Sequence, residues 1–204
     1  MKNIVILISG RGSNMEAVVR AAQAEQWPAR VAAVISNKAD AKGLEFAASH
    51  GIATAVVPNK DYPTREAFDA ALQEVIDSFQ PDLVVLAGFM RILTPGFVEH
   101  YAGRMLNIHP SLLPLFPGLH THEAALASGL AQHGATVHFV TAELDHGPMV
   151  DQVAVPILPG DTAETLSARV LQQEHILYPR AIRWFIEDRL TVEDGKVRVD
   201  QTIN

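Results

Sequence analysis

The chain has 204 residues, of which 48% are hydrophobic and 19% are charged. This is the balance of an ordinary globular protein, and the length allows one domain with a sizeable core. The formal net charge of −7 argues against a broad basic surface for nucleic acid. Because the sequence holds no cysteine, disulfides, thiolate metal sites and cysteine nucleophiles are excluded.

The first predicted element is the apolar run Ile4–Ile8. It is too short for a membrane span and is not followed by a signal-peptide cleavage region, so a buried strand explains it better. We therefore expect a cytoplasmic protein that does not bind membranes.

Strands and helices alternate through the first half of the chain. Continuous apolar runs predict buried strands, and apolar residues at helical spacing predict helices with one buried face. The sequence predicts strands over 4–8, 31–36, 54–57 and 82–87, and helices over 13–26, 43–50 and 64–79. Gly51 fits the C-terminal glycine of the second helix, and Thr94-Pro95 opens a short fourth one.

The second half adds strands over 104–108, 136–141 and 150–156. The segment from Asp161 resembles a capping box with Asp161 in the cap position, and a long helix follows to about Tyr178. Pro179 should break or kink this helix, with 181–188 continuing the helical region. A hairpin around Asp194-Gly195 is predicted over 190–199, so we expect one main domain over 1–190 and a C-terminal tail over 191–204.

This alternation implies an α/β fold, with a single doubly wound, mostly parallel sheet and helices on both faces. In such sheets, ligands bind beyond the carboxyl ends of the strands. Three predicted loops lie at such ends: Gly10–Asn14, Gly88–Leu93 and Asn107–Pro114. We therefore look for the site among these loops.

The third loop carries the strongest chemical signal. Asn107 and His109 lie two residues apart at a strand end, so their side chains point to the same side, and Pro110 stops the strand. Asp145, in a turn between two later strands, could join them. An amide, an imidazole and a carboxylate suit acyl transfer through a tetrahedral intermediate, with two oxyanion donors and a group that handles protons. A lone histidine is more often structural, and Asp145 alone would fit an ordinary Asx turn.

The other two loops suggest ligand contacts. Ser9–Asn14 combines glycines with a helix N-terminus and could hold an anion. Because Met15 takes the last glycine position of the dinucleotide motif and no Walker lysine follows, a single phosphate is more plausible than a dinucleotide, with a plain tight turn as the alternative. Ala87–Leu93 offers an apolar wall with one arginine that could hold a flat heterocycle, although core packing is the commoner explanation.

Seven of the nine histidines lie between His100 and His146, which raises the question of a metal site. His120 and His122 could bind as a pair, but no acidic residue completes a known zinc spacing nearby. We therefore expect no metal.

Glu174, on the predicted long helix, could be merely solvated, as helical glutamates usually are.

Several longer strings resemble one known family. They are ILISGRGSN, ISNKADAKGLEFA, VVLAGFMRIL, HYAGRMLNIHPSLLPLFPGLHTHEAAL, GATVHFVTAELDHGP and QQEHILYPRAI. NIHPSLLP followed by D-x-G-P is typical of folate-dependent formyltransferases, and GLHTH with SGxGSN favours the phosphoribosylglycinamide formyltransferase branch. The resemblance runs from the first strand to about residue 190, over the predicted main domain, and implies a Rossmann-like formyltransferase fold.

The resemblance implies transfer of the formyl group from 10-formyltetrahydrofolate, a co-substrate, to the amine of 5-phosphoribosylglycinamide in de novo purine biosynthesis. Both partners are small molecules, and the enzyme would be a monomer or homodimer. The implied catalytic residues are Asn107, His109 and Asp145. The substrate phosphate would be held by Gly12, Ser13 and Asn14, and the ribose side would be lined by Leu171, Gln172, Gln173 and Glu174. The folate would contact Arg65, Met90, Arg91, Ile92, Leu93, Asn107, Thr141, Ala142, Glu143, Leu144 and Asp145.

The implied mechanism is direct attack of the neutral amine on the formyl carbon. Asn107 and protonated His109 stabilise the oxyanion, Asp145 pairs with His109 and favours its cationic form, and a water near Asp145 could carry the proton. Two positions give less support to the resemblance: Leu115 stands where relatives often carry a basic residue, and His146 varies.

Three alternatives remain. Methionyl-tRNA formyltransferases share the folate half but add a C-terminal nucleic-acid-binding domain. Formyltetrahydrofolate hydrolases typically carry an N-terminal regulatory domain. A non-catalytic nucleotide- or folate-binding module would not need Asn107, His109 and Asp145 together.

Overall fold

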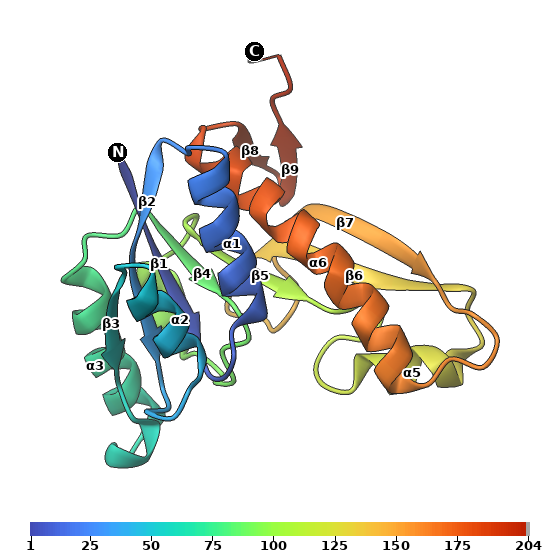
Figure 1. Cartoon of the computed structure of the whole chain (residues 1–204), viewed down its shortest axis with the longest axis horizontal. Helices are drawn as coiled ribbons and strands as arrows, with labels where there is room; N and C mark the ends of the chain where they lie inside the picture. Colours follow the sequence, from blue (N-terminus) through green and yellow to red (C-terminus); the bar gives the residue numbers. More distant parts are fainter. Residues whose placement is uncertain (203–204) are drawn as a thin grey trace. The chain divides into compact units, whose positions relative to one another are not determined.

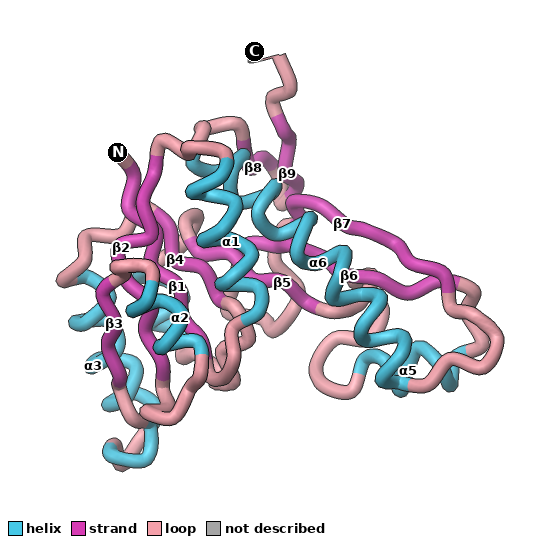
Figure 2. The backbone as a smooth tube through the Cα atoms, in the orientation of Figure 1, coloured by secondary structure: helices cyan, strands magenta, loops and turns pink. Residues whose placement is uncertain are grey.

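The computed structural model describes residues 1–202. The chain forms two compact units, residues 1–106 and the residues from Asn107 on, and each is described by itself. The seven strands of the main sheet follow the order β3-β2-β1-β4-β5-β6-β7, as Figures 1 and 2 show. The sheet is mostly parallel and flanked by helices, so the predicted α/β fold class is confirmed.

In the first unit, four parallel strands form the core. They are β1 (Lys2–Ile8), β2 (Ala29–Ser36), β3 (Ala53–Val56) and β4 (Leu83–Leu86). β1 pairs with both β2 and β4, and β2 pairs with β3. The run Ile4–Ile8 is fully buried, which explains why it is continuously apolar rather than alternating.

The helices of the first unit are α1 (Ser13–Ala24), α2 (Gly43–Ser49), α3 (Arg65–Asp77) and α4 (Pro95–His100), with a short 3₁₀ turn η1 (Asn59–Asp61). The chain moves from β1 to β2 to β3 and then returns across the sheet to β4. Because such crossovers are right-handed, α1 and α2 cover one face and α3 covers the other. The direction in which successive strands are added therefore reverses between β1 and β4. Doubly wound sheets bind ligands at such a switch point, beyond the carboxyl ends of the strands.

In the second unit, a long helix packs on an antiparallel strand pair. β5 (Met105–His109) leads into this unit, and β6 (Gln132–Phe139) pairs with β7 (Met149–Pro156). The helices are α5 (Thr121–Ser128) and α6 (Ala163–Ile186), and α6 packs on both β6 and β7. The tail forms a hairpin of β8 (Leu190–Glu193) and β9 (Lys196–Val199).

Two predictions at α6 are wrong in detail. The N-cap is Thr162, whose hydroxyl accepts the Thr165 N–H, while Asp161 accepts two hydrogen bonds from Arg169 at 2.7 and 2.9 Å. Asp161 is thus occupied by an ion pair, and the helix starts one residue later. Pro179 does not break the helix, which continues to Ile186, so the packing of this buried proline outweighs its cost to the helix backbone.

Helix α5 was not predicted at all. It is only eight residues long, and its N-cap, His120, has a left-handed backbone and makes no capping hydrogen bond with its side chain. Its buried positions are few, so the sequence carries no clear apolar stripe there.

Among the helices within residues 1–202, none is long and apolar enough to cross a membrane.

Candidate active site

Strand β5 presents two polar side chains on one side of the second unit. Ile108 separates Asn107 from His109, so strand alternation points the amide and the imidazole the same way and Ile108 the other way. Both Ile108 and His109 are buried. Pro110 follows at once and, having no N–H for the ladder, ends the strand. Both functional groups therefore face one spot at the end of β5.

The turn between β6 and β7 brings Asp145 to the same spot. The Phe139 N–H donates to the Pro148 carbonyl over 2.9 Å and closes the turn. A Cβ at Gly147 would overlap the Phe139 carbonyl, so only glycine allows the two backbone segments to approach this closely. Asp145 has a left-handed backbone with φ of 55°, which aspartate tolerates better than most residues. Its side chain is only 6% exposed, so the turn directs a carboxylate inward.

Two neighbouring groups fix the orientation of the His109 ring. Its Nε2 lies 2.8 Å from the Phe116 carbonyl, which only accepts, so Nε2 carries a proton and donates. Its Nδ1 lies 3.5 Å from Asp145 Oδ2, so the imidazole and the carboxylate are neighbours in the buried site. Asp145 Oδ2 also accepts the Gly118 N–H over 2.9 Å.

His138 joins the cluster, although the sequence reasoning assigned it no role. Its Nε2 lies 3.4 Å from Asn107 Nδ2 and 3.8 Å from Asp145 Oδ1. Its Nδ1 lies 2.9 Å from the Phe139 carbonyl, so Nδ1 carries the proton and Nε2 accepts. Burial lowers the pKa of His138, against the opposing effects of the Phe139 carbonyl and Asp145. A neutral His138 therefore accepts one Asn107 N–H, fixes the orientation of that amide and leaves the other N–H for a ligand.

A sequence signal for His138 did exist. Thr136 and His138 are polar, alternate along β6 and are both buried. Buried polar groups on a strand need partners, so two of them at alternate positions indicate a polar cluster on that face.

The loop after β5 is fastened by side chains from β6 and β7. Thr136 Oγ1 donates to the Ser111 carbonyl over 2.7 Å and accepts the Leu113 N–H over 3.1 Å. Gln152 Nε2 donates to the Leu113 carbonyl over 2.8 Å. These bonds hold the loop that carries Phe116, and with it the carbonyl that fixes the His109 ring.

A second histidine pair supports the same loop. His122 Nδ1 lies 3.1 Å from His133 Nε2, so His122 contacts His133 rather than forming a ligand pair with His120. Burial lowers the pKa of both rings, that of His133 to about 4. The His133 ring also meets the edge of Phe116, with ring centres 6.3 Å apart. Within residues 1–202, no three histidine or acidic side chains are grouped so as to hold a metal ion.

In the first unit, α1 begins directly after Gly12, whose backbone is left-handed with φ of 67°. The N-cap residue Gly12 makes no side-chain capping hydrogen bond, so this N-terminus is of the kind that can bind an anion. Ser13 and Asn14 form this turn. Met15, which replaces the last glycine of the dinucleotide motif, is fully buried and packs close to Gly12.

The loop after β4 turns apolar side chains outward. Met90 and Ile92 are 62% and 63% exposed, so core packing, the alternative weighed above, does not explain them. The Arg91 guanidinium lies 5.1 Å from the centre of the Phe68 ring on α3. Arg65, the first residue of α3, is exposed.

The remaining predicted residues lie in the second unit. Thr141, Ala142, Glu143 and Leu144 form the exposed turn that precedes Asp145. Leu171, Gln172, Gln173 and Glu174 lie on α6, where Glu174 is buried and not solvated as one interpretation had it.

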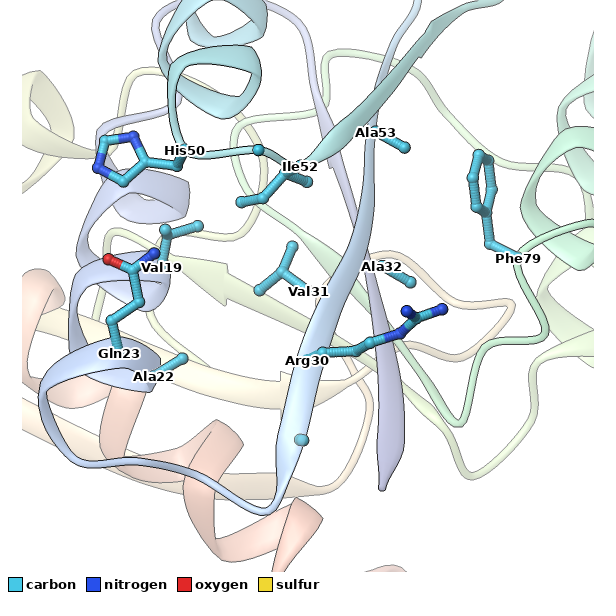
Figure 3. Close-up of a pocket in the computed structure, with 12 residues that line it drawn as sticks. Val19, Ala22, Gln23, Arg30, Val31, Ala32, His50, Ile52, Ala53 and Phe79 are labelled. Atoms are coloured by element: carbon cyan, nitrogen blue, oxygen red, sulfur yellow. The ribbon is translucent and has the colours of Figure 1, made fainter.

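The first unit also holds a cavity of about 550 Å³, whose lining residues are drawn in Figure 3. It is lined by α1, the first half of β2, the segment from His50 to Ala53, and Phe79. None of the predicted site residues lines it. The first half of β2 lies at the opposite end of the strand from the loops that carry the site.

Comparisons with known proteins point in one direction. A family model described as formyl transferase matches residues 2–182. The chain is 53% identical to the phosphoribosylglycinamide formyltransferase of Escherichia coli (strain K12), over 97% of this chain and 93% of that protein. It is 46% identical to the protein of the same name from Haemophilus influenzae, over 98% of this chain and 94% of that protein. A crystal structure of glycinamide ribonucleotide transformylase 1 from Symbiobacterium toebii superposes with a TM-score of 0.95 at 48% identity, covering 98% of this chain and 94% of that one.

Proposed function

The chain belongs to the formyl transferase family, and on that premise we propose that it transfers the formyl group of 10-formyltetrahydrofolate to the amine of 5-phosphoribosylglycinamide in purine biosynthesis. The relatives that match nearly the whole chain carry the name of this activity. The observation that carries the proposal is the cluster of Asn107, His109 and Asp145, with His138 between the amide and the carboxylate.

The cluster supplies what direct formyl transfer needs. The amine attacks the formyl carbon, a new C–N bond forms, and the carbonyl oxygen becomes an oxyanion. The free N–H of Asn107 and the His109 imidazolium stabilise that charge. The His109 Nδ1–H is available because its 3.5 Å separation from Asp145 exceeds a good hydrogen-bond distance. The bond from the formyl carbon to the folate nitrogen then breaks.

In this scheme Asp145 also assists the transfer of a proton from the attacking amine to the leaving nitrogen. The attacking amine must lose one proton, and the leaving folate nitrogen must gain one. Asp145 Oδ2 is occupied by the Gly118 N–H, whereas Oδ1 has no hydrogen-bond partner among the described residues. A water bound at Oδ1 could therefore take the proton from the amine and deliver it to the leaving nitrogen.

Ligand placement follows the sequence prediction. The phosphate would lie at the start of α1, on Gly12, Ser13 and Asn14, and the ribose side at Leu171–Glu174. The folate would contact Arg65, Met90–Leu93 and the turn Thr141–Asp145. The uncapped first turn of α1 and the exposed apolar side chains after β4 support these assignments.

The release of tetrahydrofolate, followed spectroscopically, tests the proposal. We expect release from 10-formyltetrahydrofolate only when 5-phosphoribosylglycinamide is present. Release without any acceptor would indicate a hydrolase, release only with methionyl-tRNA would indicate the tRNA branch, and no release under any condition would indicate a binding module. Each of these three outcomes would refute the proposal.

A further inference from the structure

A chain of hydrogen bonds crosses the carboxyl ends of four neighbouring strands in the first unit. The Met90 N–H donates to Ser9 Oγ over 2.8 Å, and the Ser9 O–H donates to Asn37 Oδ1 over 2.6 Å. Asn37 Nδ2 then donates to Asn59 Oδ1 over 3.0 Å. Met90, Ser9, Asn37 and Asn59 follow β4, β1, β2 and β3, which is the order of these strands in the sheet. The chain therefore links the loop after β4 to every other strand of the unit.

The two middle members of this chain are buried. Ser9 is 6% exposed and Asn37 is 3% exposed. Every bond points the same way, from Met90 toward Asn59, so each donor polarises the next group. Replacing the Ser9 hydroxyl would leave both the Met90 N–H and the Asn37 carbonyl oxygen without this partner, which is costly in a buried place.

The segment held by this chain has no regular secondary structure between Phe89 and Thr94. Two further contacts fix it from α3: Asp69 Oδ2 accepts the Thr94 N–H over 2.7 Å, and Arg91 lies over the Phe68 ring. The segment is thus fastened from the protein side at three points, while Met90 and Ile92 turn their side chains to solvent. The backbone of this irregular loop is therefore fixed, while two of its apolar side chains are exposed to a ligand.

We propose that Ser9, supported by Asn37, is a positioning residue for the folate. It fixes the backbone at Met90 and so sets the shape of the surface that Met90–Leu93 offers to the folate heterocycle. Ser9 begins the segment that could hold an anion, but neither Ser9 nor Asn37 was among the residues predicted to contact the folate. The inference deepens the proposed function and rests on it for the identity of the ligand.

Ser36 provides a matched control. It also ends a strand, β2, and is fully buried, and its Oγ accepts the Lys38 N–H over 3.0 Å. Ser36→Ala therefore also removes a serine hydroxyl that accepts a backbone N–H at this edge of the sheet, and that N–H belongs to Lys38 and not to the loop after β4. A merely structural role for Ser9 would give both variants the same behaviour.

The experiment compares Ser9→Ala, Asn37→Ala and Ser36→Ala with the wild-type enzyme in steady-state formyl transfer, and by calorimetry with tetrahydrofolate as the probe. For Ser9→Ala we expect the folate KM and the tetrahydrofolate Kd to rise about threefold to tenfold, as the loss of one buried hydrogen bond implies. We expect kcat and the KM for the nucleotide substrate to stay within about twofold by the same scale. Asn37→Ala should shift the folate constants in the same direction by less, and the double variant should be non-additive.

Unchanged folate constants in folded Ser9→Ala would overturn the proposal. So would equal weakening of both substrates, or the same folate effect in Ser36→Ala. Amide hydrogen exchange at Met90 in the ligand-free protein tests the tether separately, and it should speed up in Ser9→Ala but not in Ser36→Ala. A wild-type protein that binds no tetrahydrofolate would refute both the proposed function and the role in folate binding, while the exchange at Met90 would still show whether the tether exists.

Discussion

His133 should make the stability of this protein sensitive to mild acid. Its ring is buried in β6 against His122 and Phe116, and burial lowers its pKa from 6.5 to about 4, with smaller contributions from the charges of His122 and His109. The unfolded chain binds a proton at His133 as pH falls through 6.5, whereas the folded protein does not until about pH 4. This part of the stability is therefore complete above pH 6.5, is lost between pH 6.5 and 4, and changes no further below that.

The size of the effect follows from the two pKa values. With about 1.4 kcal/mol for each factor of ten, His133 alone removes roughly 2 to 3 kcal/mol of unfolding free energy between about pH 7.5 and 4.5. The lowered pKa of His122 acts in the same direction. Since His133 also supports the loop whose Phe116 carbonyl holds His109, acid should loosen the site together with the fold.

Urea unfolding of the wild type and of His133→Gln at several pH values between about 7.5 and 4.5 measures this effect. The wild type should lose about 2 to 3 kcal/mol more than the variant over that range. His146→Gln, a substitution of the same kind at an exposed turn position, serves as the comparison variant. Identical pH dependence in the wild type and His133→Gln would refute the reasoning.

Three further predictions concern the site itself. His109→Ala should cut turnover on the order of a hundredfold or more with little change in melting temperature, because it removes an oxyanion donor; near-normal turnover in the folded variant would contradict the assignment. Ser13→Pro should weaken the nucleotide substrate in calorimetry and leave the folate nearly unchanged, because proline at the first position of α1 removes one N–H from the proposed phosphate site; equal weakening of both ligands would point to misfolding or to a phosphate site elsewhere. Gly147→Ala should lower both the melting temperature and turnover, because its Cβ would overlap the Phe139 carbonyl in the turn that directs Asp145 inward; a variant with wild-type values of both would show that the turn can relax.

The sheet could be predicted from the sequence because its strands are nearly continuous apolar runs. Ile4–Ile8 and Leu83–Leu86 are buried on both faces, and such segments leave a clear signal. Helix α5 left none, since neither a capping side chain nor an apolar stripe marks it. The N-cap of α6 was misplaced by one residue because the partner of Asp161, Arg169, lies two turns along the helix, and a local motif does not include it.

In the candidate site, too, local patterns could be predicted from the sequence, whereas contacts between distant residues could not. Asn107 and His109 are two residues apart in one strand, so their alignment follows from alternation alone. His138 comes from another strand and looks like a core residue in the sequence. Its role depends on a neighbour across the fold, Asn107, and on the Phe139 carbonyl that fixes its tautomer. The tether through Ser9 and Asn37 was missed for the same reason, because each bond joins loops that are far apart in the chain.

All four polar groups of the cluster come from one continuous stretch, Asn107–Asp145. The side chains that handle the formyl group can therefore be inherited as a single block of sequence. The loop after β4, which carries several of the proposed folate contacts, lies outside that block, as does the start of α1. Substitutions, insertions and deletions outside the block leave its internal spacing intact, so during evolution ligand preference can drift while the reaction chemistry is preserved.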